Sequence, residues 1–473
     1  MLTLADVFEA LTNIRPGMAM PVVTEAVIDS RQVIPGSLFV AYRGEHVDGH
    51  DYIQDVFKRG ASFAIIDHDI SGSFPCIDLR EKKDLNLISI PDSPICLRVD
   101  NTLTALQQIA HFWRRKLDIR IVGITGSVGK STTKELIAEV LSKRYRTLKN
   151  PGNLNNEIGL PLTILKLSSS YERAVLEMGF YVPGEIAFLC DIALPQIGVV
   201  TNIGTVHAER AGSQEVIAEG KSELVQALPP APDGVAILNY DDPLVKAMAQ
   251  KTKAQIFYYG LNPLADLWAD EIESLGLEGI QFRLHYHDET LHVKVPMIGQ
   301  HSVHTALRAA AVGLVEKLTW QEIIEGLTSG HAQLRLVAVR SESGALLLDD
   351  TYNASPESSL SALNLLADLD GRKFAVLGDM LELGQYENQG HELVGVRAAQ
   401  ISEFLVTVGE RSHITAEAAR RAGMKASHIF EFENPGETVS FLKGFLTSRD
   451  IVLIKGSRGI HMDQIVTALE VPE

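Results

Sequence analysis

The chain has 473 residues, too many for a single hydrophobic core, so we expect two to four domains. Its 45% hydrophobic and 22% charged residues are ordinary for a folded protein, and no apolar run reaches the roughly 18 residues of a membrane span. The net charge of −17 argues against general nucleic-acid binding, which needs a basic surface. It does not exclude an anionic ligand held by a few local groups.

The amino terminus predicts an amphipathic helix and not a signal peptide. Acidic Asp6 and Glu9 stand where a secretory signal has a basic start and an apolar stretch. Cys76, Cys96 and Cys190 are odd in number and widely separated, so they indicate neither a disulfide framework nor a zinc site. We therefore expect a cytoplasmic protein without membrane insertion.

The first two regions of the chain differ in their pattern of strands. Residues 1–98 hold short apolar strands such as Ser37–Tyr42 and Ala61–Asp67. Residues 99–328 alternate strands with helices, which implies a parallel sheet covered on both faces. The elements expected there are a helix at Leu103–Lys116, a strand at Arg120–Thr125, a helix at Ser131–Arg144 and strands at Arg173–Met178 and Ile197–Asn202. Period-two alternation over Gly279–Val295 predicts an added antiparallel hairpin.

The third region, residues 329–473, begins the alternation again. The expected strands are Ala345–Asp349, Lys373–Leu377, Glu403–Val408 and Ile451–Ile454. Because a helix-like segment follows each strand, this region predicts a second doubly wound, Rossmann-like domain.

The strongest local signal is Ile119–Glu135, IRIVGITGSVGKSTTKE. A strand runs into a glycine-rich turn and then a helix, so backbone N–H groups and the helix dipole can hold phosphate. Lys130 adds a positive charge and the hydroxyl of Ser131 can hold Mg²⁺. The generic phosphate-loop spacing would need glycine at Ile124, so it fails by one residue while the strand–turn–helix context is intact. The loop alone leaves kinases, GTPases, transporters and ligases open.

Two residues after later strands indicate a metal site. Glu177 ends the strand in LEMG and His207 follows the strand in TNIGTVH. Both follow strand carboxyl ends, the edge where an open α/β sheet binds ligands and where the phosphate loop lies. A carboxylate and an imidazole there can complete a Mg²⁺ site with Ser131. Taken singly, such residues are more often solvated or capping.

Other polar residues have equally ordinary interpretations. Lys221 lies on a predicted helix, Gln214–Leu228, where a lone lysine is normally a solvated charge. Asn153, Asn155 and Asn156 in NPGNLNNEIG can contact a substrate or form turns.

Seven motifs then follow one another in a recognisable order: TGSVGKSTTKE, NLNNEIGLPLT, LEMG, TNIGTVH, DDTYNASPES, LGDMLELG and IKGSRG. This set resembles the Mur ligase family, and DSRQVIPGSLFVAYRGEHVDGHDYI resembles the family's UDP-binding domain. The resemblance covers nearly the whole chain and is nearest to the members that add D-alanyl-D-alanine. It implies an α/β fold of three domains: UDP-binding (1–98), central parallel-sheet ATPase (99–328) and Rossmann-like (329–473).

The resemblance also implies a reaction. A UDP-N-acetylmuramoyl-tripeptide carboxylate attacks the γ-phosphate of ATP to give an acyl phosphate, and the amine of D-alanyl-D-alanine then attacks the carbonyl carbon. The products are ADP, phosphate and a pentapeptide precursor of peptidoglycan. The implied cofactors are ATP and two Mg²⁺ ions, and we expect a monomer without a nucleic-acid partner.

Site roles carry over from the family to matching positions. The residues expected to be catalytic are Lys130, Glu177, His207 and Lys221. The residues expected to contact ATP are Gly126, Ser127, Val128, Gly129, Lys130, Ser131, Thr132, Arg335, Asp350 and Asn353. The expected metal ligands are Ser131, Glu177, His207 and Lys221, the last of which is carbamylated in several members. The residues expected at the other substrates are Ser30, Arg31, Asn153, Asn155, Asn156, Asp379 and Lys455.

Four residues depart from the family pattern. Thr305 stands where the family usually has an asparagine associated with adenine recognition, and Leu334 replaces the glycine that commonly precedes the arginine at the ATP site. His461 and Asp463 replace an arginine and a glutamate near the carboxyl terminus. None of these departures touches the phosphate or metal chemistry.

Four other interpretations remain. A related Mur ligase would add a single amino acid. A polyglutamate-type ligase is disfavoured because such enzymes lack a UDP-binding domain. A regulatory P-loop ATP-binding protein would have no use for Glu177, His207 and Lys221 together, and a non-enzymatic scaffold would leave the phosphate loop unexplained.

Overall fold

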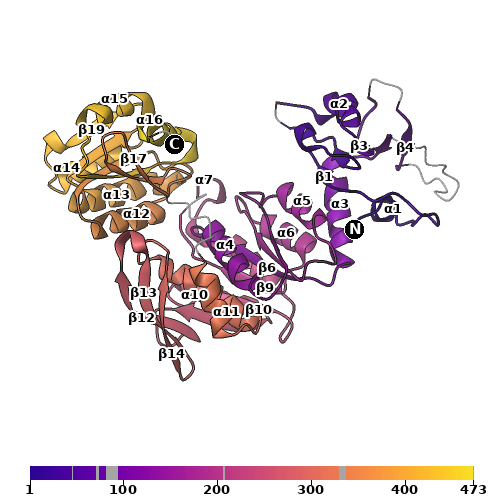
Figure 1. Cartoon of the computed structure of the whole chain (residues 1–473), viewed down its shortest axis with the longest axis horizontal. Coiled ribbons are helices and arrows are strands. Elements are labelled where there is room, and N and C mark those ends of the chain that lie inside the picture. The colour runs from indigo at the N-terminus through magenta and orange to yellow at the C-terminus, as the bar shows by residue number, and fades with distance from the viewer. Residues whose placement is uncertain (45, 71–73, 81–93, 206–207, 330–336, 472–473) are drawn as a thin grey trace. The chain divides into compact units, whose positions relative to one another are not determined.

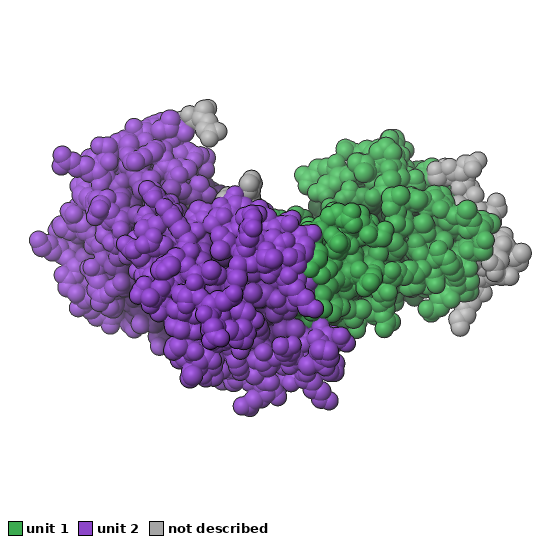
Figure 2. Space-filling view, turned by 60° about the horizontal axis from the view of Figure 1, so that its bottom comes forward, with its two compact units in different colours: residues 1–123, 145–179, 185–197 green, residues 124–144, 180–184, 198–473 purple. Residues whose placement is uncertain are grey.

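The computed structural model describes residues 1–44, 46–70, 74–80, 94–205, 208–329 and 337–471. The chain divides into two compact units, coloured separately in Figure 2: unit 1 is residues 1–123, 145–179 and 185–197, and unit 2 is residues 124–144, 180–184 and 198–473. The domain boundaries expected after residues 98 and 328 stay predictions. In the part of the chain described here, no helix has the length and apolar character needed to cross a membrane.

The first sheet is parallel throughout and lies near the amino terminus (Figure 1). Its order is β1-β2-β3-β5-β4. The strands are β1 (Ala26–Val27), β2 (Leu38–Val40), β3 (Phe63–Ile66), β4 (Cys76–Asp78) and β5 (Ile95–Arg98). The helices of this part are α1 (Leu4–Thr12), α2 (Ile53–Lys58) and α3 (Thr102–Arg115). The predicted amino-terminal helix is confirmed, and it begins with a capping box between Thr3 and Asp6.

The second sheet has nine strands in the order β14-β13-β12-β11-β10-β9-β6-β8-β7. They are β6 (Arg120–Thr125), β7 (Thr147–Lys149), β8 (Arg173–Glu177), β9 (Ile197–Val200), β10 (Val235–Asn239), β11 (Gln255–Gly260), β12 (Leu267–Ser274), β13 (Ile280–Tyr286) and β14 (Glu289–Val295). Strands β13 and β14 pair antiparallel, which confirms the predicted hairpin. Every residue of β9 and all but the first of β6 are buried, as expected for parallel strands covered on both faces.

The helices that follow these strands in the chain are mostly short. They are α4 (Lys130–Leu141), α5 (Gly159–Leu165), α6 (Glu185–Ala193), α7 (Ala208–Ala211), α8 (Gln214–Gln226), α9 (Pro243–Ala247), α10 (Ser302–Val315) and α11 (Trp320–Thr328). Helix α4 packs against α10 and α11 in unit 2.

The third sheet has the order β15-β16-β20-β17-β18-β19. Its strands are β15 (Val337–Arg340), β16 (Leu346–Asp350), β17 (Arg372–Gly378), β18 (Phe404–Val408), β19 (Ile429–Phe432) and β20 (Asp450–Lys455). Its helices are α12 (Pro356–Asp368), α13 (Glu387–Ile401), α14 (His413–Arg421), α15 (Pro435–Phe445) and α16 (Asp463–Leu469). Only the edge strand β15 pairs antiparallel among the pairs of this sheet.

Alternation along β17 shows how this sheet is covered. Ala375 and Leu377 pack with residues of α12, α13 and α14, whereas Phe374 and Val376 pack with residues of α15 and α16. Helices therefore cover both faces, and the predicted doubly wound fold is confirmed. The carboxyl ends of its parallel strands form the edge at which such sheets bind ligands.

Candidate active site

The phosphate loop lies between β6 and α4 in unit 2. Gly126 has a φ of +142°, and a β-carbon at this position would lie 1.9 Å from Oγ1 of Thr201, so only glycine fits. Gly129 has a φ of +83° and directly precedes α4. These two left-handed residues turn the chain from the end of the strand into the helix start, where backbone N–H groups have no intrahelical partner.

Residues after β9 brace this loop. Asn202 accepts the N–H of Val128 through Oδ1 at 2.9 Å, and the hydroxyl of Thr201 donates to the carbonyl of Val128 at 2.8 Å. The N–H of Gly204 donates to Oγ of Ser127 at 2.8 Å. Sequence reasoning placed TNIG among the motifs but gave Thr201 and Asn202 no role. Polar residues directly after a buried strand were the available signal.

Lys130 opens α4 and lies against the loop itself. Its ammonium donates to the carbonyl oxygens of Gly126 at 2.9 Å and Ser127 at 3.1 Å. Ser131 and Thr132 follow in the first turn of the helix. The positive charge, the helix dipole and the loop amides therefore converge on one small region, which suits a phosphate group.

Lys221 lies under the same loop, although its sequence context is that of a solvated helical lysine. It is fully buried on α8, and its Nζ lies 3.0 Å from the carbonyl oxygen of Gly126. Nζ also lies 4.6 Å from the centre of the Phe180 ring. Burial lowers the pKa of the Lys221 amine well below its ordinary value, and the positive charge of Lys130 lowers it further. The amine is thus disposed to be neutral and nucleophilic.

Glu177 ends β8 in unit 1 and is buried. Its Oε1 accepts a hydrogen bond from the side-chain amide of Asn155 at 2.9 Å. Asn150 holds the backbone of Glu177 on both sides, accepting from its N–H and donating to its carbonyl oxygen. Asn156 instead accepts from the N–H groups of Ile158 and Gly159 at the start of α5. Of the predicted asparagines, Asn155 is the one that positions Glu177.

Each unit carries an oxygen donor of a kind that Mg²⁺ prefers. In unit 1, the carboxylate of Glu177 is oriented by the side-chain amide of Asn155. In unit 2, Ser131 has a hydroxyl oxygen in the first turn of α4. Predicted His207 and Arg335, together with Leu334, lie outside the described residues.

Three predicted residues meet at the carboxyl ends of β16 and β20. Lys455 is 2% exposed, and its Nζ pairs with Oδ2 of Asp350 at 2.6 Å and donates to the carbonyl oxygen of Asn353 at 2.9 Å. The buried charge of Lys455 is therefore neutralised by Asp350. This places residues predicted for ATP and for the second substrate in one cluster.

Other predicted residues hold local structure. Asp379 is buried after β17, and its Oδ1 accepts the N–H of Ser412 at 2.7 Å. Arg31 is largely exposed and pairs with Asp29 at 2.8 Å, which lowers the pKa of the Asp29 carboxyl. Ser30 begins the short 3-10 helix Ser30–Gln32.

The departures from the family pattern are also located. The hydroxyl of Thr305, on α10, accepts from Arg308 at 2.7 Å. His461 has a left-handed φ of +57°, and Asp463 begins α16. Asn153, also predicted at the substrate, accepts the N–H of Asn155 through its carbonyl oxygen.

Within unit 2, the motif segments TNIGTVH and DDTYNASPES are in contact. Oε1 of Glu357, on α12, accepts the N–H of Thr205 at 3.1 Å and its hydroxyl at 3.3 Å. The LGDMLELG segment continues into Gln385, whose side-chain amide donates to the carbonyl of Gly212 at 2.9 Å. Sequence reasoning gave Glu357 no role.

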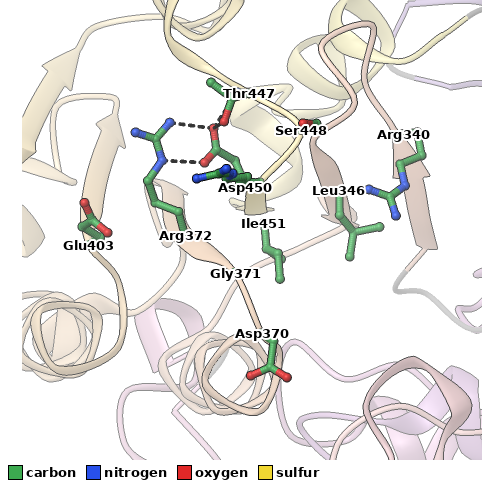
Figure 3. Close-up of a pocket in the computed structure, with 11 residues that line it drawn as sticks. Arg340, Leu346, Asp370, Gly371, Arg372, Glu403, Thr447, Ser448, Asp450 and Ile451 are labelled. Atoms are coloured by element: carbon green, nitrogen blue, oxygen red, sulfur yellow. Dashed lines mark hydrogen bonds and ion pairs between the residues drawn. The ribbon is translucent and has the colours of Figure 1, made fainter.

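A pocket of about 1030 Å³ lies elsewhere, at the amino ends of β17 and β20 (Figure 3). There Arg372 pairs with Asp450 through two contacts. Burial by itself would raise the pKa of Asp450, but Arg372 and the N–H of Thr447 outweigh it and lower the pKa. Arg372 and Asp450 lie at the amino ends of their strands. Parallel sheets of this kind bind ligands at the carboxyl ends of their strands, so the pocket is not the candidate active site.

A glycine-rich loop between a buried strand and a helix, with two lysines beside it, defines a P-loop nucleotide-binding protein. Comparison with known families is more specific. The description "Mur ligase family, catalytic domain" matches residues 23–114, "Mur ligase middle domain" matches 124–313, and "Mur ligase, glutamate ligase domain" matches 334–458.

Individual relatives agree over nearly the full length. The UDP-N-acetylmuramoyl-tripeptide–D-alanyl-D-alanine ligase of Bacillus subtilis is 34% identical, covering 97% of this chain and 95% of the relative. The crystal structure of MurF from Acinetobacter baumannii is 30% identical with a TM-score of 0.83, covering 98% of each chain. MurF from Thermotoga maritima in complex with ADP is 27% identical with a TM-score of 0.77, covering 97% of each chain. The chain belongs to the Mur ligase family.

Proposed function

We propose that this chain is an ATP-dependent ligase that joins D-alanyl-D-alanine to UDP-N-acetylmuramoyl-tripeptide and releases ADP and phosphate. The reaction belongs to the synthesis of peptidoglycan precursors in the cytoplasm. Support comes from near-full-length similarity to ligases named for this reaction. The structural observation that carries the proposal is the buried amine of Lys221, held 3.0 Å from the phosphate-loop carbonyl of Gly126.

The proposed chemistry assigns the loop the task of holding the γ-phosphate. A carboxylate oxygen of the tripeptide attacks the γ-phosphorus, the bond to the β-phosphate oxygen breaks, and ADP leaves. Lys130 and the N–H groups at the start of α4 stabilise the negative charge on the transferred group. The amine of the dipeptide then attacks the acyl carbonyl, loses a proton and expels phosphate.

Metal ligation is the second part of the proposal. The residues that would hold Mg²⁺ are Ser131, Glu177, His207 and Lys221. When bound, Mg²⁺ neutralises negative charge on the phosphate and acyl oxygens. The neutral amine of Lys221 suits attack on CO₂, which forms an N–C bond, loses one proton and yields a carbamate. That modification converts a buried nitrogen donor into oxygen ligands, which Mg²⁺ prefers.

Substrate contacts complete the proposal. Ser30 and Arg31 would contact the uridine end, and Arg335, Asp350 and Asn353 the nucleotide. The residues proposed at the tripeptide and dipeptide are Asn153, Asn155, Asn156, Asp379 and Lys455. We also propose that the protein acts as a monomer.

The test is phosphate release from ATP and Mg²⁺, measured with UDP-muramoyl-tripeptide alone, D-alanyl-D-alanine alone and both together. The proposal requires release only with both substrates and a pentapeptide product by mass spectrometry. Turnover with a single amino acid but no dipeptide would instead identify a related Mur ligase. ATP binding without turnover on either acceptor would favour a regulatory P-loop protein.

A further inference from the structure

Besides Lys130 and Lys221, a further basic residue, Arg308, lies next to the phosphate loop on α10. It is 4% exposed, and among the described residues its hydrogen bonds reach only hydroxyl groups: Nη2 donates to Oγ1 of Thr305 at 2.7 Å, and Nη1 donates to the phenol oxygen of Tyr259 at 3.4 Å. Its guanidinium carbon also lies 5.8 Å from the centre of the Tyr259 ring. Its buried Nε has no hydrogen-bond partner among the described residues. No carboxylate of the described residues forms an ion pair with Arg308.

This arrangement contrasts with that of Arg114, which is also buried on a helix. All three nitrogens of Arg114 donate to carbonyl oxygens: Nε to Ala193 at 2.7 Å, Nη1 to Leu117 at 2.9 Å and Nη2 to Ile119 at 2.7 Å. Arg114 is also 4% exposed, so the chain can satisfy a guanidinium fully at this depth. At Arg308 it does not, and a buried positive charge with an unused donor is destabilising unless an anion joins it.

The guanidinium lies beside the turn that enters α4. A β-carbon built on Gly129 would be 3.4 Å from Nη2 of Arg308. Helix α10 packs directly on α4, so this position follows from the packing of the two helices. The start of α4 is where the loop amides and Lys130 converge. Arg308 thus supplies a second cation at the border of a region already built to hold an anion.

Two hydroxyl residues fix the direction of the guanidinium. The phenol of Tyr259 is fully buried and donates to the carbonyl oxygens of Val200 at 3.3 Å and Thr201 at 3.2 Å, so its oxygen is left to accept from Arg308. Thr305 accepts from the other terminal nitrogen. Thr201 also donates a hydrogen bond to Val128 in the phosphate loop. Arg308, through Tyr259, and the loop are therefore both held by contacts with Thr201.

Thr305 stands where the family resemblance expects asparagine. An asparagine amide offers a donor and an acceptor, which suits the edge of a base. Here the threonine hydroxyl is bonded to Arg308, and the side chain directed to the loop is a guanidinium, which only donates. Donors with a full positive charge suit phosphate oxygens, and the planar fork binds them in pairs.

We propose that Arg308 binds the phosphate chain of the nucleotide at the P-loop, with Tyr259 and Thr305 as positioning residues. This inference rests on the proposed function only in that a nucleotide occupies the loop. Adjacent phosphate groups of the nucleotide would supply the anion that Arg308 lacks in the protein.

The test measures nucleotide affinity directly by calorimetry on the full chain, with ATP, ADP, GTP and adenosine as ligands. Arg308→Met should weaken ATP and ADP binding about tenfold or more, because charge-assisted hydrogen bonds are lost. Arg308→Lys should recover part of the affinity by keeping the charge. Adenosine binding and the ATP to GTP ratio should not change. Arg283→Met is the matched control, since Arg283 pairs with Asp270 on the surface of β13 and β12.

A second measurement separates binding from a structural role. Without nucleotide, Arg308→Met should keep or raise the thermal midpoint, because it removes a buried charge that has no protein anion. A lower midpoint with unchanged ATP affinity would overturn the proposal and make Arg308 structural. Equal losses for adenosine, or a loss that depends on the base, would also overturn it. If the parent chain binds no nucleotide, the proposed function fails as well, whereas normal binding by both proteins rejects only the role of Arg308.

Discussion

The amine of Lys221 and the carbonyl oxygen of Gly126 lie 3.0 Å apart in a region from which water is excluded. One partner is fully buried on a helix, and the other is the glycine that opens the phosphate loop. A charged amine at this position would have to lose its hydration beside the positive charge of Lys130. Burial and the charge of Lys130 therefore lower the pKa of the Lys221 amine, although the sequence of the helix indicates an ordinary solvated lysine.

The first prediction concerns stability and pH. Burial lowers the pKa of folded Lys221, whereas the unfolded chain has the ordinary value of about 10.4. Between the two values the unfolded chain binds more protons, so the free energy of unfolding rises with pH. Lys221→Met removes this dependence. In CO₂-free buffer, we expect the variant to be more stable than the parent near neutral pH, and thermal unfolding should show the difference shrinking towards pH values of about 10. A pH-independent difference would contradict the assigned pKa direction.

The second prediction concerns the reactivity of the same amine. If Lys221 carries a carbamate, degassed CO₂-free buffer should lower the rate of phosphate release, and added bicarbonate should restore it. Lys221→Met should be inactive in both buffers. A carbamate is too labile to be detected dependably by mass spectrometry. The direct measurement is therefore ¹³C NMR after incubation with labelled bicarbonate. An unchanged rate together with no labelled carbon would show that Lys221 acts as an amine.

The third prediction concerns the phosphate loop. Lys130→Ala removes the ammonium that lies against Gly126 and Ser127, and we expect phosphate release to fall at least about a hundredfold because charge on the transferred phosphoryl group is no longer stabilised. Lys143→Ala, an exposed lysine just beyond the other end of α4, is the matched control and should retain the parent rate. Near-normal turnover in Lys130→Ala would remove the phosphate-loop assignment.

Neighbouring asparagines give the fourth prediction. Asn155 donates to Oε1 of Glu177, so Asn155→Ala should raise the Mg²⁺ concentration needed for half-maximal activity about tenfold. Asn156 accepts the N–H groups of Ile158 and Gly159 at the start of α5, so Asn156→Ala should lower the free energy of unfolding by about 1 kcal/mol and leave the Mg²⁺ requirement unchanged. Magnesium titrations and thermal unfolding of both variants distinguish the two roles. Identical behaviour of the two variants would refute the assignment of Asn155.

Several strands that are apolar along their length could be predicted from the sequence, although the fully buried β10 was missed. The strand expected at Arg120–Thr125 has those same bounds, and the one expected at Lys373–Leu377 is extended by one residue at each end. The short strands β4 and β7 were not predicted. Neither has a buried residue, so neither carries a continuous apolar run that local pattern could detect.

The functional residues of the candidate site could be predicted where they lie in one continuous segment. They could not be predicted where residues from several segments come together in the fold. The loop around Lys130 is contiguous, so its pattern is visible in the sequence. Arg308 lies in an alanine-rich helix, and its relation to the loop arises only from the packing of α10 on α4. Asn202 supports the loop from just after β9, far along the chain. Sequence spacing contains neither relationship, because both depend on tertiary packing.

The fifth prediction concerns the ion pair between Asp350 and Lys455, which joins the ends of two paired strands at 2.6 Å. Lys455→Met should lower the free energy of unfolding by about 2 kcal/mol, since it leaves the mostly buried carboxylate of Asp350 without its partner. The double variant Asp350→Asn with Lys455→Met should regain much of that loss, because neither charge then remains unpaired. Chemical denaturation of the two single variants and the double variant gives the coupling energy. Ligase activity should stay low in the double variant, since stability is restored without the charges proposed to contact the substrates. Full activity in that variant would mean that the pair serves only to join the strands.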